Sequence, residues 1–364
     1  MASWDSVDVG ADQPARAELL RAVLADQLPA ADRPGALDRE PGYDPGLHAQ
    51  LNEEFGLAGW TIPAEFGGRG QSLVEACAIH TELGRVLYPG PFLPSAVAAG
   101  TLLAAGQREA CEQWLPQLAD GSVAATVAAA DEAGRWAPGP GSVRARYGAG
   151  GWSLIGRRWY AVAAHAASLL LVPAVTDSGL AMFAVETSAS GVSIARQLDL
   201  DLTRRVSKVT LEAAPAVLLA KDGVAALARA EQEFLIATAA EAAGGISWSL
   251  DAIMTAVQDT GQGGSFTETA QFYVDMLNDL EQVSAAARYA AAVTDLGSPE
   301  APTAARVAAL QAGSSFRRVI DGAMAYVAET DAQLYYRRAW SAERLSGGPQ
   351  AHRDALSATA VRPS

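Results

Sequence analysis

The stretch Gly-Trp-Thr-Ile-Pro-Ala-Glu-Phe-Gly-Gly-Arg-Gly, residues 59–70, is the most informative part of this chain. A helical pattern follows it directly. After it, apolar side chains recur at helical spacing and form one stripe: Leu73, Ala76, Cys77, His80, Leu83 and Leu87. The Pro-Gly-Pro cluster at 89–91 is expected to end this helix. Further helices are predicted over 94–105 and 107–118, so residues 1–120 are expected to form an N-terminal helical domain.

The composition excludes several classes of protein. The chain has 364 residues, of which 50% are hydrophobic and 19% charged, so it is not an intrinsically disordered protein. A chain of this length is expected to form two or three packed domains. Its 27 Lys and Arg residues against 41 Asp and Glu residues give a net charge of −14. That charge repels nucleic acid phosphates and anionic lipid, so neither is an expected partner, although a local arginine cluster can still bind an anionic coenzyme A ester.

The cysteines and the start of the chain predict a cytoplasmic protein. Cys77 and Cys111 lie in helix-like stretches, far from any zinc-ligand spacing, and are expected to be free thiols in the core. No metal site is therefore predicted. The acidic, polar start of the chain does not resemble a signal peptide. No apolar run reaches the roughly 20 residues that a membrane-spanning helix needs.

The middle and the end of the chain differ in pattern. Within residues 121–220, glycine- and proline-rich turns separate short runs with strand composition, at 152–155, 168–172, 181–185 and 208–211. We predict a small antiparallel β domain there. Long helical patterns return over 221–346 and predict a C-terminal four-helix bundle, whose alanine-rich helices suit a dimer or tetramer. Residues 347–364 lack periodicity and are expected to form a flexible tail.

Four motifs occur in the order found in the acyl-CoA dehydrogenase family, which the chain resembles over nearly its whole length. Residues 60–70 resemble its Pro-Glu-Glu-Tyr-Gly-Gly segment, 115–121 its Leu-Pro-x-Leu-x-x-Gly turn, and 151–158 its Gly-Trp-x-Leu-x-Gly-x-Lys strand. Residues 200–205 resemble the Asp-x-Thr-Arg-Arg run of shorter bacterial members, several of which act on sterol side chains as mixed complexes of two different subunits. The resemblance implies a mostly α, α+β fold: an N-terminal helical domain, a central antiparallel β domain and a C-terminal helical bundle.

The resemblance also implies a reaction and a cofactor. In the family, FAD lies between the β domain and the bundle and takes a hydride from the acyl β-carbon, while a glutamate removes the α-proton. A positioned carboxylate is needed for the proton, and the protein itself has no hydride acceptor. The expected activity is therefore a flavin-dependent α,β-dehydrogenation of acyl-CoA or of a carrier-bound acyl thioester.

The departures from the family pattern cluster at the flavin. The threonine of the family's Leu-Thr-Glu-Pro strand aligns with Ala130. The family's Trp-Ile-Thr/Ser element, beside the flavin N5, aligns with Tyr160, Ala161 and Val162. The aromatic ring is kept as a tyrosine, but neither hydroxyl donor remains.

The positions that hold the ADP half of FAD depart as well. Ser265 and Phe266 keep the start of a helix, but the arginine that would precede them and meet the pyrophosphate is absent. The family's glycine-rich turn is replaced by residues 322–327, which form a poor phosphate cradle because side chains occupy the places where backbone N–H groups must approach oxygen. Retention of FAD by this chain is therefore doubtful.

Three residues are candidate acids or bases. Glu241 stands in an otherwise apolar helical pattern, where a carboxylate can act as a base near neutral pH; alternatively, it lies on a wet edge or pairs with an arginine. Glu329 matches a glutamate beside the acyl pocket of relatives, or is an acidic residue that favours a helix start. His165 falls close to the expected flavin edge, although a lone histidine rarely defines chemistry.

Two arginines are candidate substrate ligands. Arg204 and Arg205 could bind a phosphate of coenzyme A or a neighbouring subunit, since arginine suits bidentate contacts to anions. The alternative is a surface salt bridge.

The sequence leaves two main hypotheses for function. In the first, the chain is a subunit that works beside a better-preserved acyl-CoA dehydrogenase partner, which completes the flavin site. In the second, the scaffold is repurposed without a redox cofactor, and Glu241, Glu329 or His165 acts as acid or base in an elimination, cyclisation or other proton transfer. An inert structural subunit and an ordinary FAD-containing homotetramer stay open.

Overall fold

The computed structural model describes residues 13–28, 40–136, 143–260, 266–327, 329–345 and 347–360. It describes the side chains of these residues except those of 13–15, 259–260, 266–270, 329–331 and 360. The chain divides into two compact units. One, the helical unit, comprises residues 1–35, 72–88 and 235–340; the other, the mixed unit, comprises residues 36–71, 89–234 and 341–364. In the described part of the chain, no helix is both long and apolar enough to cross a membrane.

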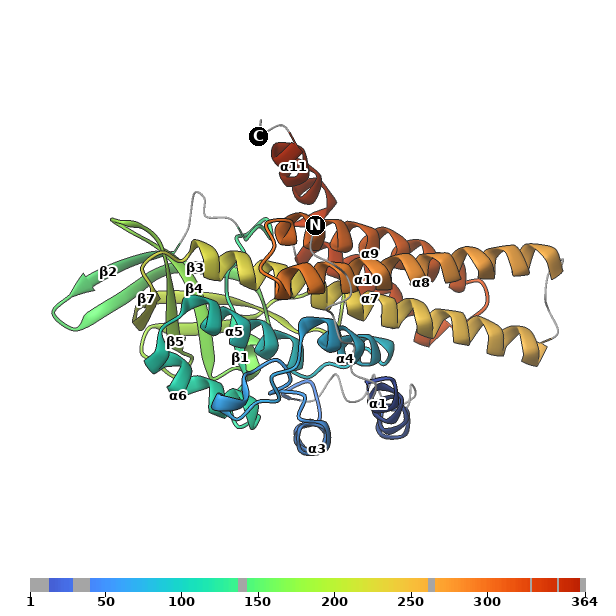
Figure 1. The fold of residues 1–364 in the computed structure, drawn as a ribbon, viewed down its shortest axis with the longest axis horizontal. Helices are drawn as coiled ribbons and strands as arrows, with labels where there is room; N and C mark the ends of the chain where they lie inside the picture. Colours follow the sequence, from blue (N-terminus) through green and yellow to red (C-terminus); the bar gives the residue numbers. More distant parts are fainter. Residues whose placement is uncertain are drawn as a thin grey trace. The chain divides into compact units, whose positions relative to one another are not determined.

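The three helices predicted individually, α4, α5 and α6, lie where the sequence patterns place them, apart from their ends. Before the sheet the helices are α1 (Gln13–Gln27), α3 (Pro45–Phe55), the short η3 (Ala64–Phe66), α4 (Leu73–Arg85), α5 (Phe92–Ala105) and α6 (Arg108–Ala119). After it come α7 (Val224–Thr260), α8 (Phe266–Asp295), α9 (Ala301–Ala323), α10 (Glu329–Leu345) and α11 (Gly348–Ala360). Figure 1 shows α8 and α9 running side by side within the helical unit.

Helix α4 shows how the local sequence sets a boundary. Ser72 caps its start, with the Ser72 hydroxyl accepting from the Glu75 N–H and the Glu75 carboxylate accepting from the Ser72 N–H. This capping box satisfies two donors that a helix start leaves without partners. The expected stripe is largely buried, since Leu73, Ala76, Cys77, His80 and Leu83 are all less than a tenth exposed.

Residues 59–70 form a compact turn that precedes α4 in the chain. The N–H groups of Arg69 and Gly70 donate to the carbonyls of Gly59 and Ile62, at 2.9 and 2.8 Å. A Cβ at Gly68 would overlap the Ile62 carbonyl, so only glycine lets the two backbones approach this closely. The motif therefore has a structural role, because its glycines allow the backbone to fold back on itself.

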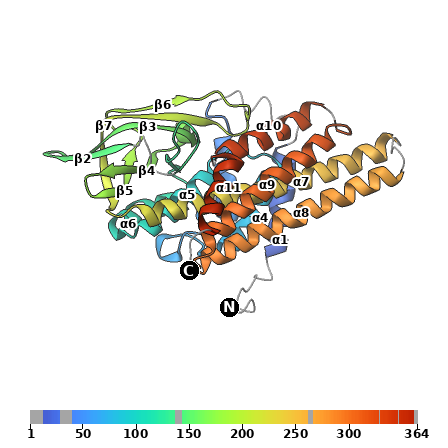
Figure 2. The ribbon, with the colours of Figure 1, turned by 90° about the horizontal axis from the view of Figure 1, so that it is seen from above.

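The predicted β domain is present as a seven-stranded sheet in the mixed unit. Its strands are β1 (Ala125–Val127), β2 (Arg144–Gly148), β3 (Gly151–Val162), β4 (Leu169–Thr176), β5 (Gly179–Glu186), β6 (Val192–Arg196) and β7 (Val206–Ala220). Most pairings are antiparallel, as expected, but β4 pairs in parallel with β1 and with β2. Because β4 also pairs with β5, the order β4-β2-β3-β7-β5 closes on itself. Figure 2 shows β6 alongside β7, outside this closed ring.

The core of the sheet lies inside this ring. Its fully buried members include Leu154, Leu170, Phe183 and Val209, contributed by four different strands. The hydrophobic runs of the strands thus face one another, and their burial stabilises the closed sheet.

Two sequence-based expectations are corrected. Residues 348–360 form helix α11, and its His352 is buried, so the expected flexible tail is wrong for this stretch. Within the long helical patterns expected over 221–346, the pattern at 302–327 forms a helix only as far as Ala323, because residues 324–327 form a turn. The succession of helical, β and helical segments is as expected. The division into three domains stays a prediction, since the two compact units combine segments from all of them.

Candidate functional site

The two positions expected beside a flavin ring lie in the mixed unit and present no polar side chain. Ala130 is 3% exposed, and its carbonyl accepts the N–H of Trp159 at 3.0 Å. The next N–H, that of Asp131, donates to the Arg135 carbonyl at 2.9 Å. Val162 is buried and pairs with Val206 in the β3–β7 ladder. The Ala130 carbonyl and the Asp131 N–H are thus bonded within the chain.

Tyr160 occupies a bulge in strand β3. Its φ of 52° is unusual for a residue other than glycine, and the β3–β7 register shifts between Arg158 and Ala161. Its N–H donates to the side-chain oxygen of Gln197 at 2.7 Å. Gln197 was not predicted as a site residue, because 37 residues separate it from Tyr160 in the sequence. Side chains of a regular strand point alternately to its two faces. The bulge interrupts this alternation and so changes the direction of the Tyr160 side chain.

His165 lies in the 3₁₀ turn η4 (Ala164–Ala166) and is held by the segment around Pro41. Its Nε2 lies 2.6 Å from the Pro41 carbonyl, which can only accept, so Nε2 carries the proton and donates. Its Nδ1 is buried and has no hydrogen-bond partner among the described residues. Burial lowers the pKa of His165, which keeps the ring neutral. The ring is therefore a neutral histidine whose donor is already engaged.

Arg204 and Arg205 are buried, at 6% and 8% exposure. The Nη1 of Arg205 donates to the carboxylate of Glu40 at 2.8 Å. The alternative of a salt bridge is thus realised for Arg205, although its own side chain is buried and only the Glu40 side chain lies at the surface. A role of either arginine in binding substrate stays a prediction.

Glu241 belongs to α7 in the helical unit and forms a buried ion pair. The Nη1 of Arg338, on α10, donates to its carboxylate at 3.1 Å, and the two residues are 3% and 8% exposed. This is the alternative that the sequence left open, an arginine partner, rather than an unpaired base in apolar surroundings. The partner was missed because it lies 97 residues away.

The remaining predicted site residues lie outside the described residues, either entirely or with their side chains. Glu329 is the first residue of α10, but its side chain lies outside the described residues, as does that of Phe266 at the start of α8. Ser265 lies outside them entirely. Their predicted roles therefore stay predictions.

The turn after α9 uses its own backbone donors. The N–H of Met324 donates to the Ile320 carbonyl, that of Ala325 to Gly322, and those of Tyr326 and Val327 both to Ala323, at 2.9 to 3.3 Å. The ring of Phe272 also lies so close to Gly322 that a Cβ there would overlap it. Four consecutive donors are thus bonded inside the chain.

The sequence and the fold can be compared with known proteins. Residues 11–122 match the family model described as acyl-CoA dehydrogenase, N-terminal domain. The acyl-CoA dehydrogenase IpdE2 of Mycolicibacterium smegmatis is 29% identical over 344 residues, covering 92% of this chain and 95% of that protein.

Solved structures share the fold. The ChsE4-ChsE5 complex from Mycobacterium tuberculosis matches with a TM-score of 0.87 and 23% identity, over 98% of this chain and 99% of that one. A glutaryl-CoA dehydrogenase from Mycobacterium smegmatis, in complex with FADH2, matches with a TM-score of 0.83 and 18% identity, over 97% and 95%. Residues 11–122 therefore match the N-terminal domain of the acyl-CoA dehydrogenase family, and the chain as a whole shares the fold of these solved structures.

Proposed function

We propose that this chain is one subunit of a two-chain complex that desaturates an acyl thioester, and that the other chain holds most of the flavin. The observation that carries the proposal is the set of missing donors. Ala130 and Val162 offer no hydroxyl, and the N–H groups of 324–327 are bonded within the chain. A phosphate or a flavin carbonyl needs N–H or O–H donors. The residues present do not fit the flavin contacts that the family resemblance implies.

The comparisons support the two-chain form of this proposal. A solved structure with this fold is a complex of two named chains, ChsE4 and ChsE5. If the partner supplies the cofactor contacts, the losses in this chain need no other compensation. In such a complex this chain contributes a contact surface for its partner and part of the thioester site.

The second hypothesis, acid–base chemistry without a cofactor, has less support. Glu241 is paired with Arg338, and the His165 donor is engaged by the Pro41 carbonyl. A general base must be free to accept a proton from the substrate. Glu241 would have to leave Arg338 before it could act, and the unprotonated Nδ1 of His165, the atom that would accept a proton, is buried.

An exposed loop supports contact with a second chain. Between β6 and β7, Leu198 is 100% exposed, Leu200 56% and Leu202 37%. We name these three residues the leucine loop. It is ordered by internal bonds, because the Gln197 N–H donates to the Val206 carbonyl at 3.0 Å and the Thr203 N–H to the Asp201 carboxylate at 2.8 Å. Large aliphatic side chains on a fixed loop are typical of a protein interface.

The net charge of the chain favours one kind of binding partner for the leucine loop. A second copy would bring another net charge of −14 and a second Asp199 between the leucines. Like charges brought together disfavour association. We therefore propose that the occupant is a different, acyl-CoA dehydrogenase-like chain that is less acidic at this contact.

The visible absorbance spectrum tests the proposal. The chain is purified alone, with and without added FAD, and again after co-expression with a second acyl-CoA dehydrogenase-like chain from the same genome. We expect no flavin bands from the chain alone and a flavin-containing complex from the pair. Flavin at about one per chain in the protein purified alone contradicts the proposal. So does a stable pair that contains no flavin.

A further inference from the structure

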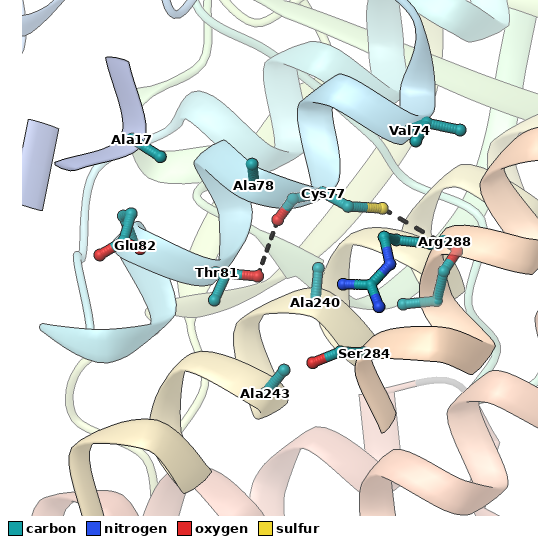
Figure 3. A pocket seen from close by; sticks show the side chains of 11 residues that line it. Ala17, Val74, Cys77, Ala78, Thr81, Glu82, Ala240, Ala243, Ser284 and Arg288 are labelled. Atoms are coloured by element: carbon teal, nitrogen blue, oxygen red, sulfur yellow. Dashed lines mark hydrogen bonds between the residues drawn. The ribbon is translucent and has the colours of Figure 1, made fainter. Parts of the chain in front are cut away.

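A pocket in the helical unit includes none of the candidate site residues proposed from the sequence. Its volume is about 460 Å³, within the roughly 300–1,000 Å³ usual for small-molecule sites. Helices α1, α4, α7 and α8 surround it (Figure 3). Five of its lining residues are alanines: Ala17, Ala78, Ala240, Ala243 and Ala287. Their short side chains leave the space between the helices open.

The apolar part of the pocket consists of these alanines with Val74 and Cys77. Cys77 is 4% exposed, and burial raises the pKa of its thiol to about 12. The thiol therefore stays protonated and behaves as a small apolar group. None of the described residues that line the pocket is aromatic, so a flat ring system would find no stacking partner among them. A flexible alkyl chain suits such a wall better.

Two polar groups on α4 are already engaged. The Thr81 hydroxyl donates to the Cys77 carbonyl at 2.8 Å. The carboxylate of Glu82 accepts from Arg21 twice, at 2.7 and 2.8 Å. The negative charge of Glu82 is thus offset by its own arginine, and neither group is left to bind a ligand.

Two polar groups on α8 have no such partner. Ser284 and Arg288 are one helical turn apart and therefore lie on the same face. Within the described ranges, neither side chain makes a hydrogen bond or an ion pair. Figure 3 shows the Arg288 guanidinium extended from α8 towards the side of the pocket where Ala240 lies. One cation and one hydroxyl are thus available above an apolar wall.

We propose that this pocket binds an amphipathic alkyl carboxylate, with its chain against the alanines and its head group on Arg288 and Ser284. Arginine binds carboxylates through two parallel N–H donors, and the serine hydroxyl can add a third. A single cation matches a single negative charge. A phosphate monoester, with close to two charges, would need a second cation, and among the described lining residues Arg288 alone is cationic.

The pocket does not include the candidate base Glu241 or its partner Arg338. Ala240 and Ala243 face it from α7, whereas neither Glu241 nor Arg338 lines it. Helical geometry places residues 240 and 243 on one face and turns residue 241 about 100° away. The site is therefore additional to the proposed thioester chemistry and stands without it.

Calorimetric titration of the full-length chain with decanoate tests the proposal, with decanol as the neutral probe. We expect one decanoate per chain. R288Q is expected to weaken decanoate binding at least about tenfold and to change decanol binding less than about twofold, because only the carboxylate uses the cation. Ala78→Phe, which fills the pocket, is expected to weaken both ligands at least about tenfold.

Two control variants match these changes outside the pocket. R353Q removes an exposed arginine from α11. Ala216→Phe places the same ring in a different pocket, of about 300 Å³, between α6 and the sheet. Neither control is expected to change decanoate binding more than about twofold.

The proposal is overturned by any of three results. They are no decanoate binding, equal binding by R288Q and the unmodified chain, and weaker binding in Ala216→Phe without weaker binding in Ala78→Phe. Because Arg288 is exposed, the R288Q result does not depend on whether Ala78→Phe folds. A thermal unfolding curve of each variant confirms its fold.

Discussion

The buried pair of Glu241 and Arg338 shows, at the scale of single residues, what the surroundings do to a carboxylate. Removing one partner of a buried ion pair takes the compensating charge away from the other, which typically costs about 3–5 kcal/mol. We expect R338A to lower the free energy of unfolding by about that amount, measured by urea denaturation, and the double change E241Q with R338M to recover much of it. The pair Arg108 and Glu112 is the control, because both side chains are more than half exposed.

The R108A control shows whether the stability loss of R338A is specific to the buried pair. R108A is expected to cost less than about 1 kcal/mol, as exposed pairs do. An R338A variant as stable as R108A would mean that Glu241 does not depend on Arg338. That result would return Glu241 to the list of candidate bases.

His48 predicts a dependence of stability on pH. Its ring stacks on Phe92 with a centroid distance of 4.0 Å, and burial lowers its pKa to about 4. The unfolded histidine titrates near 6.5, so between pH 6.5 and 4 the unfolded state binds more protons than the folded state. Stability is therefore lost as the pH falls through this window. We expect the unmodified chain to lose on the order of 1 kcal/mol more than H48Q between pH 7 and 5, by urea denaturation. Equal losses would contradict the assignment.

At the scale of helices, the contact between α4 and α7 depends on glycine. A Cβ at Gly84 would overlap the backbone of Glu241, and one at Gly244 would overlap the carbonyl of Thr81. A Cβ at Gly245 would meet only the ring of Phe316. Because a backbone yields less than a side chain, we expect G84A and G244A each to cost about 1–3 kcal/mol and G245A less, measured by thermal unfolding. A G245A variant that loses as much as the other two would refute this ordering.

At the scale of the whole molecule, the leucine loop is expected to govern assembly. In the two-chain complex, replacing Leu198 and Leu200 by aspartate should raise the dissociation constant at least about tenfold, since buried aliphatic contacts are lost and like charges are added. Val224→Asp is the matched control, because Val224 is also exposed, at 59%. Sedimentation velocity of the mixed chains measures the effect. Equal weakening by both variants would mean that added charge, rather than the loop, disfavours assembly.

The sequence by itself determined the succession of helical, β and helical segments and the resemblance to the acyl-CoA dehydrogenase family. The spacing of Leu73, Ala76, Leu83 and their neighbours predicts α4, and the glycines of 59–70 predict a tight turn, because both depend on residues close together in the chain. The missing hydroxyls at Ala130 and Val162 can likewise be read directly from the sequence.

The tertiary structure alone decided which groups are free to act. Glu241 meets Arg338, His165 meets the Pro41 carbonyl, and Tyr160 meets Gln197, across 97, 124 and 37 residues of sequence. It also brought together the residues of α1, α4, α7 and α8 that line the pocket of the helical unit. A local pattern reports the face on which a side chain lies but not what packs against that face, and the partner sets the charge, pKa and accessibility of each group.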